Sequence, residues 1–273
     1  MEKINTVAVV MVPLPAQGHL NQLLHLARII STRGLPVHFI GSSIQNRQAK
    51  DRVHGWDVST ISNIHFHDFE IPHFITPPAD PNASNKFPSY LVPTFEAYVN
   101  LREPLGALIR ELALSNRRVV VVHDSLMAFA SKEAASVFNA EAYSFVSVSS
   151  FVVPHLISVT HEDVPCVSFE ETHTNNFMEF VTLNAQWLNY CSGDIYNSCY
   201  AIEGRFLDVM ADLQIDKNVW AIGPFHPLEF HPSGGYRHNC LEWLDEQPPS
   251  SVIYISFGTM TSISDEHVGS TTY

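Results

Sequence analysis

Positive charge is scarce in this sequence of 273 residues. Lysine and arginine together number 15, against 28 aspartates and glutamates, which gives a formal net charge of -13 at pH 7. The basic residues are scattered and form no stripe along the chain. Proteins that bind nucleic acid or anionic membranes electrostatically need clustered basic residues. The composition therefore argues against both kinds of partner.

Cysteines are few, and long apolar runs are absent. The four cysteines, Cys166, Cys191, Cys199 and Cys240, include no C-x-x-C pair, so we expect a reducing compartment and no disulfide framework. No segment approaches the roughly 18 apolar residues that a membrane-spanning helix needs. The apolar run after Lys3 is short and ends in prolines, unlike a signal peptide. We expect a cytoplasmic monomer.

The common nucleotide and nucleophile motifs are also missing. No G-x-G-x-x-G and no P-loop lysine follows the first predicted strand, so no dinucleotide or ATP site is visible. No G-x-S-x-G elbow is present. His123, Asp124 and Ser125 are contiguous, and contiguous residues do not converge as a catalytic triad. A hydrolase is therefore disfavoured.

Histidines are numerous, but they show no metal-ligand spacing. His65 and His67 lie two apart on a predicted strand and hence on one face, with Asp68 on the other. A metal site is conceivable there, but no third ligand is evident, and a half-exposed strand face explains the pattern better. The remaining histidines read as surface or loop residues. We expect no metal.

What the sequence does contain is an alternation of strands and helices. Apolar residues make up 45% of the chain and charged residues 16%, which is typical of a globular protein. The first part has predicted strands at 7–12, 35–40, 64–69, 119–122 and 142–146, and predicted helices at 19–34, 44–54, 94–115 and 126–138. This alternation predicts an α/β fold with a Rossmann-like, doubly wound parallel sheet.

The pattern continues and then breaks off. Helices are predicted at 174–188 and 201–213, with short strands at 194–197 and 219–222. Proline, glycine and histidine without periodicity mark a linker at 223–238. A short helix at 240–245 and a strand at 251–257 then begin a second α/β unit. We therefore divide the chain into a first domain at 1–222, the linker, and the start of a truncated second domain at 239–273.

His19 and Asp124 are the leading functional candidates. Each follows a predicted strand, and if the strand order is 3-2-1-4-5, strands one and four are neighbours. Both side chains would then flank the crevice at the switch point of the sheet, where ligands bind. An aspartate on one ring nitrogen can orient a histidine that acts as a base, and the start of a helix should disfavour its charged form. A histidine at a helix start and a capping aspartate would look the same.

Two further turns could approach a ligand. Gly18, before the first helix, would allow a ligand close to the backbone. The sequence Ser256-Phe257-Gly258-Thr259 follows the last predicted strand and could offer a hydroxyl and free amides to a diphosphate. An ordinary turn explains either stretch equally well.

The residues together resemble the plant UDP-dependent glycosyltransferases of small-molecule metabolism, and among these the chain looks most like the zeatin O-glucosyltransferases. One of the segments that carry the resemblance is Pro13-Leu-Pro-Ala-Gln-Gly-His-Leu-Asn-Gln-Leu-Leu-His-Leu-Ala-Arg28. The other segments are 62–72, 87–97, 101–106, 119–128, 193–197, 219–224 and 240–259. Together they cover most of residues 5 to 261.

The resemblance implies a GT-B architecture, with the acceptor held by the first domain and the nucleotide sugar by the second. It implies that His19 is the catalytic base and Asp124 its partner. It places Gly18 near the donor, Ser147 near the sugar and Thr259 near the diphosphate. UDP-glucose would be a co-substrate, with no cofactor or metal.

The resemblance also implies an inverting transfer of glucose to a hydroxyl of a small acceptor such as zeatin. The proline-rich loop at 70–93 is then a candidate acceptor wall, with Phe74, Phe87 and Tyr90 as its contacts. A loop that merely covers the core is an equal alternative.

One departure from the family is large. The signature box that begins Trp-Ala-Pro-Gln and continues to His-Cys-Gly-Trp-Asn is absent. In the family, these residues hold the uridine and the phosphates. The alternative function is therefore a truncated, non-catalytic product that binds an acceptor but lacks the donor site. A phenolic acceptor, and xylose in place of glucose, stay open.

Overall fold

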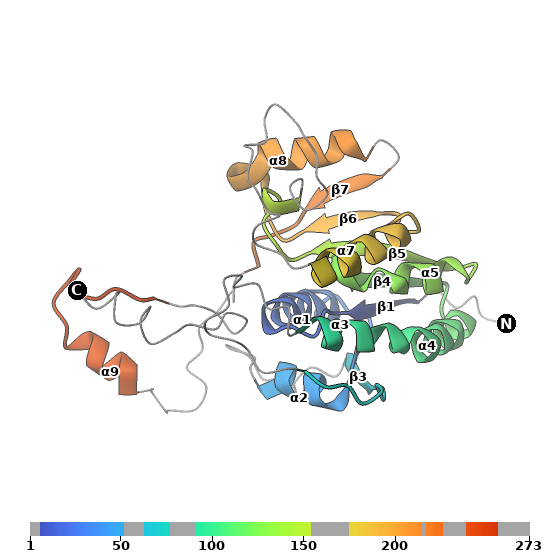
Figure 1. The fold of residues 1–273 in the computed structure, drawn as a ribbon, viewed down its shortest axis with the longest axis horizontal. Helices are drawn as coiled ribbons and strands as arrows, with labels where there is room; N and C mark the ends of the chain where they lie inside the picture. The colour runs from blue at the N-terminus through green and yellow to red at the C-terminus, as the bar shows by residue number, and fades with distance from the viewer. Residues whose placement is uncertain are drawn as a thin grey trace.

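A seven-stranded parallel sheet forms the centre of the molecule (Figure 1). The computed structural model describes residues 6–51, 63–76, 91–153, 175–214, 217–225 and 239–255. The strands are β1 (Val7–Val12), β2 (Val37–Gly41), β3 (Ile64–Asp68), β4 (Arg118–Asp124), β5 (Ala140–Val146), β6 (Gly193–Tyr196) and β7 (Asn218–Ala221). Their order is β3-β2-β1-β4-β5-β6-β7, so the predicted order of the first five strands is confirmed.

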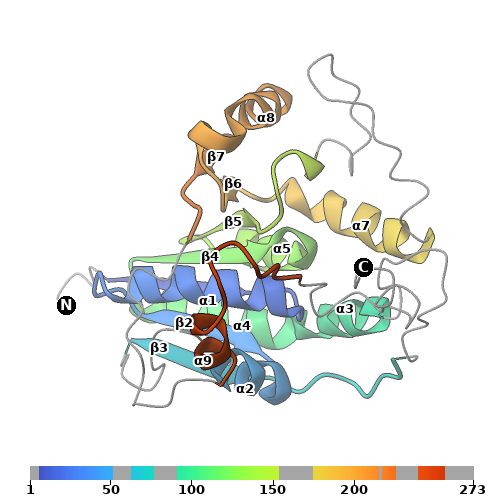
Figure 2. The same ribbon diagram turned by 90° about the vertical axis from the view of Figure 1, so that its left-hand side faces the viewer.

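Helices cover both faces of this sheet. The α-helices are α1 (Gln17–Ser31), α2 (Ser43–Asp51), α3 (Val92–Tyr98), α4 (Arg102–Ser115), α5 (Phe129–Ala135), α7 (Asn175–Leu188), α8 (Tyr200–Leu213) and α9 (Asn239–Asp245). Within the described ranges, the 3-10 turns are η3 (Val99–Leu101) and η4 (Ser125–Met127). One face packs on α1 and α2, and the other on α3, α4, α5 and α7. Figure 2 shows α1 running along the sheet and α8 beside β7.

The central strands are apolar because both of their faces are buried. In β1 every residue from Ala8 to Val12 is buried, and β4 is buried along most of its length. Strands covered by helices on both sides have near-continuous apolar sequences rather than alternating ones. The valine-rich runs at 7–12 and 119–122 form β1 and β4, and these two buried strands pair with each other in the middle of the sheet.

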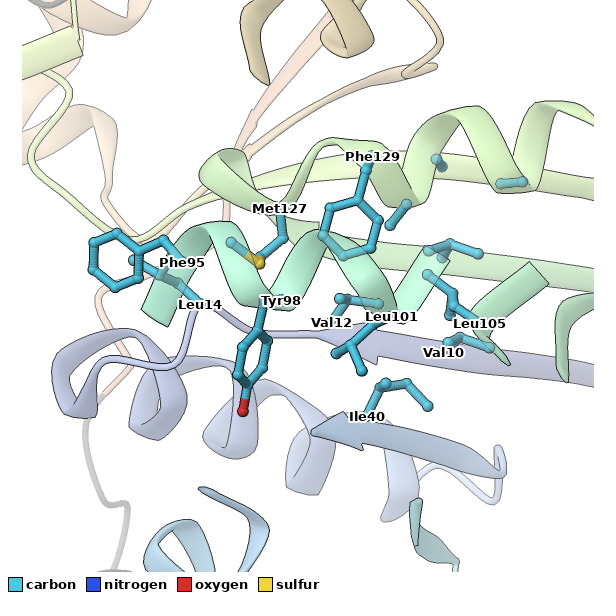
Figure 3. Close-up of a cluster of buried hydrophobic side chains, with 14 of the residues drawn as sticks. Val10, Val12, Leu14, Ile40, Phe95, Tyr98, Leu101, Leu105, Met127 and Phe129 are labelled. Atoms are coloured by element: carbon cyan, nitrogen blue, oxygen red, sulfur yellow. The ribbon is translucent and has the colours of Figure 1, made fainter. Parts of the chain in front are cut away.

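The larger core lies between the sheet and helices α3, α4 and α5 (Figure 3). Phe95, Tyr98 and Phe129 supply the largest side chains of this core, and all three are almost completely buried. The Tyr98 hydroxyl hydrogen-bonds the Ser42 side chain at 3.1 Å, which ties α3 to the end of β2. Burial raises the pKa of Tyr98 to about 12, so the phenol is neutral.

The helix predicted at 94–115 is wrong in its continuity. The chain forms α3, then one 3-10 turn at 99–101, then α4. Pro104 explains the break, because in a continuous helix its ring would clash with the carbonyl four residues earlier. The helix predicted at 126–138 is likewise divided into η4 and the shorter α5.

The strand predicted at 251–257 is also wrong over its described part. Residues 251–255 form no strand, and Ile253 and Tyr254 are 85% and 88% exposed. A strand needs neighbours to bond and cover it, and within the described ranges none lies beside this segment. Helix α9 lies apart from the sheet and buries none of its residues (Figure 1). Of the predicted linker, only residues 223–225 are described.

An apolar groove lies on the sheet face that carries α1, between that helix and strands β5 to β7. Its volume is about 440 Å³. Its lining residues come from β1, α1, β4, β5, β6 and the chain around β7, and include Leu26, Val122, Tyr143, Ile195 and Trp220. Trp220 and Ile222 are 39% and 43% exposed. The second half of the sheet is thus left partly uncovered on this face.

Among the described helices, none combines the length and the apolar composition of a membrane-spanning segment.

Candidate active site

His19 and Asp124 meet at the carboxyl edge of the sheet. His19 is the third residue of α1, and Asp124 is the last residue of β4 rather than the residue after it. Because β1 and β4 are adjacent, with Val12 opposite His123, the short turn after β1 brings His19 over the end of β4. His19 Nδ1 lies 2.7 Å from Asp124 Oδ2. The predicted pair is therefore formed.

Both interpretations of Asp124 apply to this residue. Its side chain is completely buried, and one carboxylate oxygen accepts a hydrogen bond from the backbone N–H of Leu126 at 3.0 Å. This bond caps η4. The other oxygen faces His19. A carboxylate held on both sides keeps a fixed orientation, so the cap also helps to direct Asp124 toward His19.

Ser147 joins this pair. It follows β5, and its Oγ lies 2.6 Å from His19 Nδ1 and 3.3 Å from Asp124 Oδ2. The resemblance placed this hydroxyl near a sugar. The structure brings it against the histidine–aspartate pair, so the site contains three mutually bonded side chains.

The pKa of His19 is shifted in the direction opposite to the expectation. Burial lowers the pKa of this imidazole, but the negative charge and the hydrogen bond of Asp124 raise it by more, so that it lies above the ordinary value of 6.5. The prediction that the start of α1 would disfavour the charged form is wrong. A buried carboxylate at 2.7 Å acts at shorter range than the helix dipole.

The geometry also determines which ring nitrogen can act as a base. A carboxylate only accepts hydrogen bonds, so the neutral ring places its proton on Nδ1, toward Asp124. The lone pair is then on Nε2. The His19 side chain is 17% exposed. The arrangement can therefore take a proton at Nε2 and stabilise the resulting imidazolium through Asp124.

The other predicted ligand contacts are only partly described. Gly18 is exposed at the start of α1, and a Cβ there would meet no atom within 4 Å. Phe74 is half-buried in an irregular segment after β3. Phe87, Tyr90 and Thr259 lie outside the described residues. These donor and acceptor contacts stay predictions.

Two histidines proved more buried than expected. His123 is fully buried in β4, with Nδ1 2.8 Å from the Asp124 carbonyl oxygen and Nε2 3.2 Å from Cys191 Sγ. His38 on β2 lies beside the predicted pair, with Nδ1 2.9 Å from His67 Nε2. Within the described ranges, no group of three or more histidine, cysteine or acidic side chains is placed to hold a metal ion.

Gln22 and Asn197 were not anticipated. The Gln22 amide donates to the Ser147 carbonyl oxygen at 2.9 Å, and Asn197 donates to Gln22 Oε1 at 2.6 Å. Gln22 lies three residues after His19 on α1, and therefore on the same side of the helix. That spacing was the one feature of the sequence that could have indicated Gln22 as a neighbour of His19. The contact of Gln22 with Asn197 joins residues 175 positions apart, and no pattern in the sequence indicated it.

Comparisons with known proteins identify the family of the chain. The family described as "Glycosyltransferase, N-terminal domain" matches residues 5–227. The zeatin O-glucosyltransferase of Phaseolus lunatus is 43% identical over 274 residues, which cover 96% of this chain and 58% of that protein. The zeatin O-xylosyltransferase of Phaseolus vulgaris is 41% identical, with 96% and 59% covered.

Solved structures show the same fold. The Arabidopsis thaliana UGT89C1 complex with quercetin superposes with a TM-score of 0.69 at 19% identity, over 96% of this chain and 60% of that one. Glycyrrhiza uralensis UGT73P12 gives a TM-score of 0.67 at 19% identity, over 94% and 57%. The predicted GT-B-type fold is confirmed. The chain spans just under three fifths of the length of the relatives it matches, and by its sequence and fold it belongs to the plant UDP-dependent glycosyltransferases.

Proposed function

We propose that this chain is the acceptor-binding part of an inverting UDP-sugar-dependent O-glycosyltransferase. The contact of 2.7 Å between His19 and Asp124 carries the proposal, because it leaves Nε2 as a base at the ligand-facing edge of the sheet. The transfer would move glucose from UDP-glucose to a hydroxyl of a small acceptor. Zeatin is the acceptor that we propose, because the relatives at 40–43% identity are named for it.

The reaction needs one displacement at the anomeric carbon. His19 Nε2 takes the proton of the acceptor hydroxyl while the oxygen forms the new bond to that carbon. The bond from the carbon to the diphosphate breaks, and UDP leaves with the bonding electrons. The transition state has oxocarbenium character, as in glycoside hydrolysis. Asp124 stabilises the imidazolium until the proton passes to solvent.

The remaining roles belong to the same proposal. Gly18, Ser147 and Thr259 would lie along the donor, and Phe74, Phe87 and Tyr90 along the acceptor. The domain division at 222 and 239, a cytoplasmic location and the absence of a cofactor are part of this proposal as well.

The activity is tested in a chimaera that joins this chain to the part of the Phaseolus lunatus relative beyond the matched region. We expect His19→Ala to lower kcat for zeatin glucosylation by roughly 10²- to 10⁴-fold, the usual contribution of a general base. UDP-glucose affinity should stay nearly unchanged. His25→Ala, on the same helix, is the matched control and should retain turnover. Retained turnover in His19→Ala would reject the proposed base.

A second candidate is a product that binds the acceptor without catalysis. The observation that favours it is that the matched N-terminal family domain, residues 5–227, contains both His19 and Asp124 and the proposed acceptor contacts. Calorimetry on the 273-residue chain separates the two functions. Heat on adding zeatin, with none on adding UDP-glucose, supports acceptor binding alone. Micromolar binding of UDP-glucose by this chain would contradict it.

A further inference from the structure

A series of side-chain hydrogen bonds leads from Phe225 to His19. The backbone N–H of Phe225 donates to Asn197 Oδ1 at 2.8 Å. Asn197 Nδ2 donates to Gln22 Oε1 at 2.6 Å, and Gln22 Nε2 donates to the Ser147 carbonyl oxygen at 2.9 Å. The Ser147 hydroxyl then lies 2.6 Å from His19 Nδ1. Four links thus connect the start of the segment at 223–238 with the proposed base.

The direction of these bonds is fixed at one end. A backbone N–H can only donate, so the amide oxygen of Asn197 must face Phe225. Its NH₂ group therefore faces Gln22, and the Gln22 oxygen must face Asn197 in turn. This orientation leaves the Gln22 NH₂ group directed at the Ser147 carbonyl. No amide in the series can be rotated by 180° without opposing two donors or two acceptors.

The anchoring of Asn197 makes this series rigid. Asn197 follows β6, and its backbone N–H donates to the Val146 carbonyl at 3.2 Å. Gly223 packs directly against it, since a Cβ at position 223 would come within 2.9 Å of the Asn197 Cα. Gln22 thus receives a bond from a residue held by β5, β6 and the departing chain. It transmits that restraint to Ser147 from α1.

Ser147 completes a triangle with the proposed catalytic pair. Its hydroxyl proton is directed to Asp124 Oδ2 at 3.3 Å, so its oxygen presents a lone pair to His19 Nδ1–H at 2.6 Å. The imidazole proton is then shared by two acceptors. Displacing Ser147 would open one side of this bond to water.

We propose that Gln22 is a positioning residue, which holds Ser147 against the His19–Asp124 pair and links that pair to the chain leaving the sheet at Phe225. The proposal deepens the function proposed above and rests on His19 being the base. Gln22 bonds to the Ser147 carbonyl oxygen rather than to the His19 ring or the Asp124 carboxylate. It acts through the Ser147 backbone.

The test measures how fast the His19 Nδ1 proton exchanges with water, by NMR of the 273-residue chain. We expect exchange to be roughly fivefold faster in Gln22→Leu, the factor for one neutral hydrogen bond. Ser147→Ala should have a similar effect. If Gln22 acts through Ser147, the double variant should exchange no faster than the faster single variant. The amides of Val10 and Val121 report global stability and should not change.

Two variants make the result specific. Gln22→Glu can still accept from Asn197 but cannot donate to Ser147, so it should match Gln22→Leu, and it serves if the leucine variant fails to fold. Gln17→Leu is the matched control, because the Gln17 amide bonds to Asn21 within α1. It should leave the exchange unchanged.

The outcomes also separate this inference from the proposed function. Unchanged exchange in both Gln22 variants, or additive effects with Ser147→Ala, would reject the positioning role. The measurement needs no sugar transfer. Suppose that the chimaera needs His19 for activity but the exchange is unchanged in the Gln22 variants: only the role of Gln22 is then rejected. If instead the Gln22 variants alter the exchange but the His19→Ala chimaera stays active, only the role of His19 as the base is rejected.

Discussion

Burial and the neighbouring Asp124 shift the pKa of His19 in opposite directions. Burial alone would lower the pKa of the imidazole, and Asp124 raises it above 6.5. The bond between the two side chains stabilises the fold fully below pH 6.5, the ordinary pKa of histidine, and this contribution is lost as pH rises through the raised pKa. The base catalysis that we propose needs the neutral form, so the proposed transfer should speed up over the same rise in pH.

Asp124→Asn tests this account at a single atom. Removing the negative charge leaves burial as the larger influence, so the pKa of His19 should fall below 6.5. The measurement is a histidine Cε1–H NMR titration of the 273-residue chain. Asp68→Asn, at the end of β3, is the control. A pKa of His19 that stays above 6.5 in Asp124→Asn would contradict the account.

The buried His123 should make the stability of the fold depend on pH in the opposite direction. Burial lowers its pKa to about 4, despite the nearby Asp124. A folded pKa below the unfolded one means that stability is lost as pH falls through 6.5 toward 4, by up to about 1.4 kcal/mol per pH unit. Urea unfolding at pH 7 and pH 5 should show a smaller loss in His123→Gln. The exposed His73 provides the control, because His73→Gln should keep the wild-type loss.

At the scale of residues, the sequence predicted the pairing of His19 with Asp124 but not the contact that Ser147 adds. His19 and Asp124 could be found because each comes at the end of a strand, and the carboxyl ends of parallel strands share one edge. The contact of Ser147 with His19 depends on how β5 and α1 lie against β4. No local pattern in the sequence encodes that packing.

Among the elements, periodicity predicted which segments are strands and which are helices. Periodicity failed where one residue ends a helix or where a predicted strand has no neighbouring strand to pair with. Pro104 divides the helix predicted at 94–115, and the strand predicted at 251–257 has no strand beside it in the described part. A strand depends on partners elsewhere in the chain, so its own sequence cannot guarantee it.

The edge formed by β6 and β7 offers a test of packing. A Cβ on Gly193 would come within 2.6 Å of the Asn218 carbonyl oxygen and would also collide with the Trp220 ring. We expect Gly193→Ala to lower the free energy of unfolding by about 1–3 kcal/mol, as overpacking does. Gly204 in α8 has only ordinary contacts, so Gly204→Ala should be neutral or slightly stabilising. Equal effects in urea unfolding would contradict this.

At the scale of the whole molecule, the apolar groove beside α1 is an unusual surface of the described part of the chain. Contiguous apolar surface of this kind should bind hydrophobic dyes. We expect the 273-residue chain to enhance the fluorescence of ANS at pH 7, and Ile222→Lys to reduce that enhancement at least about twofold, because a charge in the groove opposes apolar ligands. Phe138→Lys, on an exposed loop after α5, should not reduce it. Identical fluorescence in both variants would place the dye elsewhere.

The same groove makes colloidal behaviour depend on salt. Copies of a chain with a net charge of -13 repel one another. This repulsion extends over a Debye length of about 10 Å at 0.1 M salt and about 3 Å at 1 M. When it is screened, two grooves can approach closely enough for Trp220 and its neighbours to leave water together. Low ionic strength is therefore the condition that should keep this chain dispersed in solution.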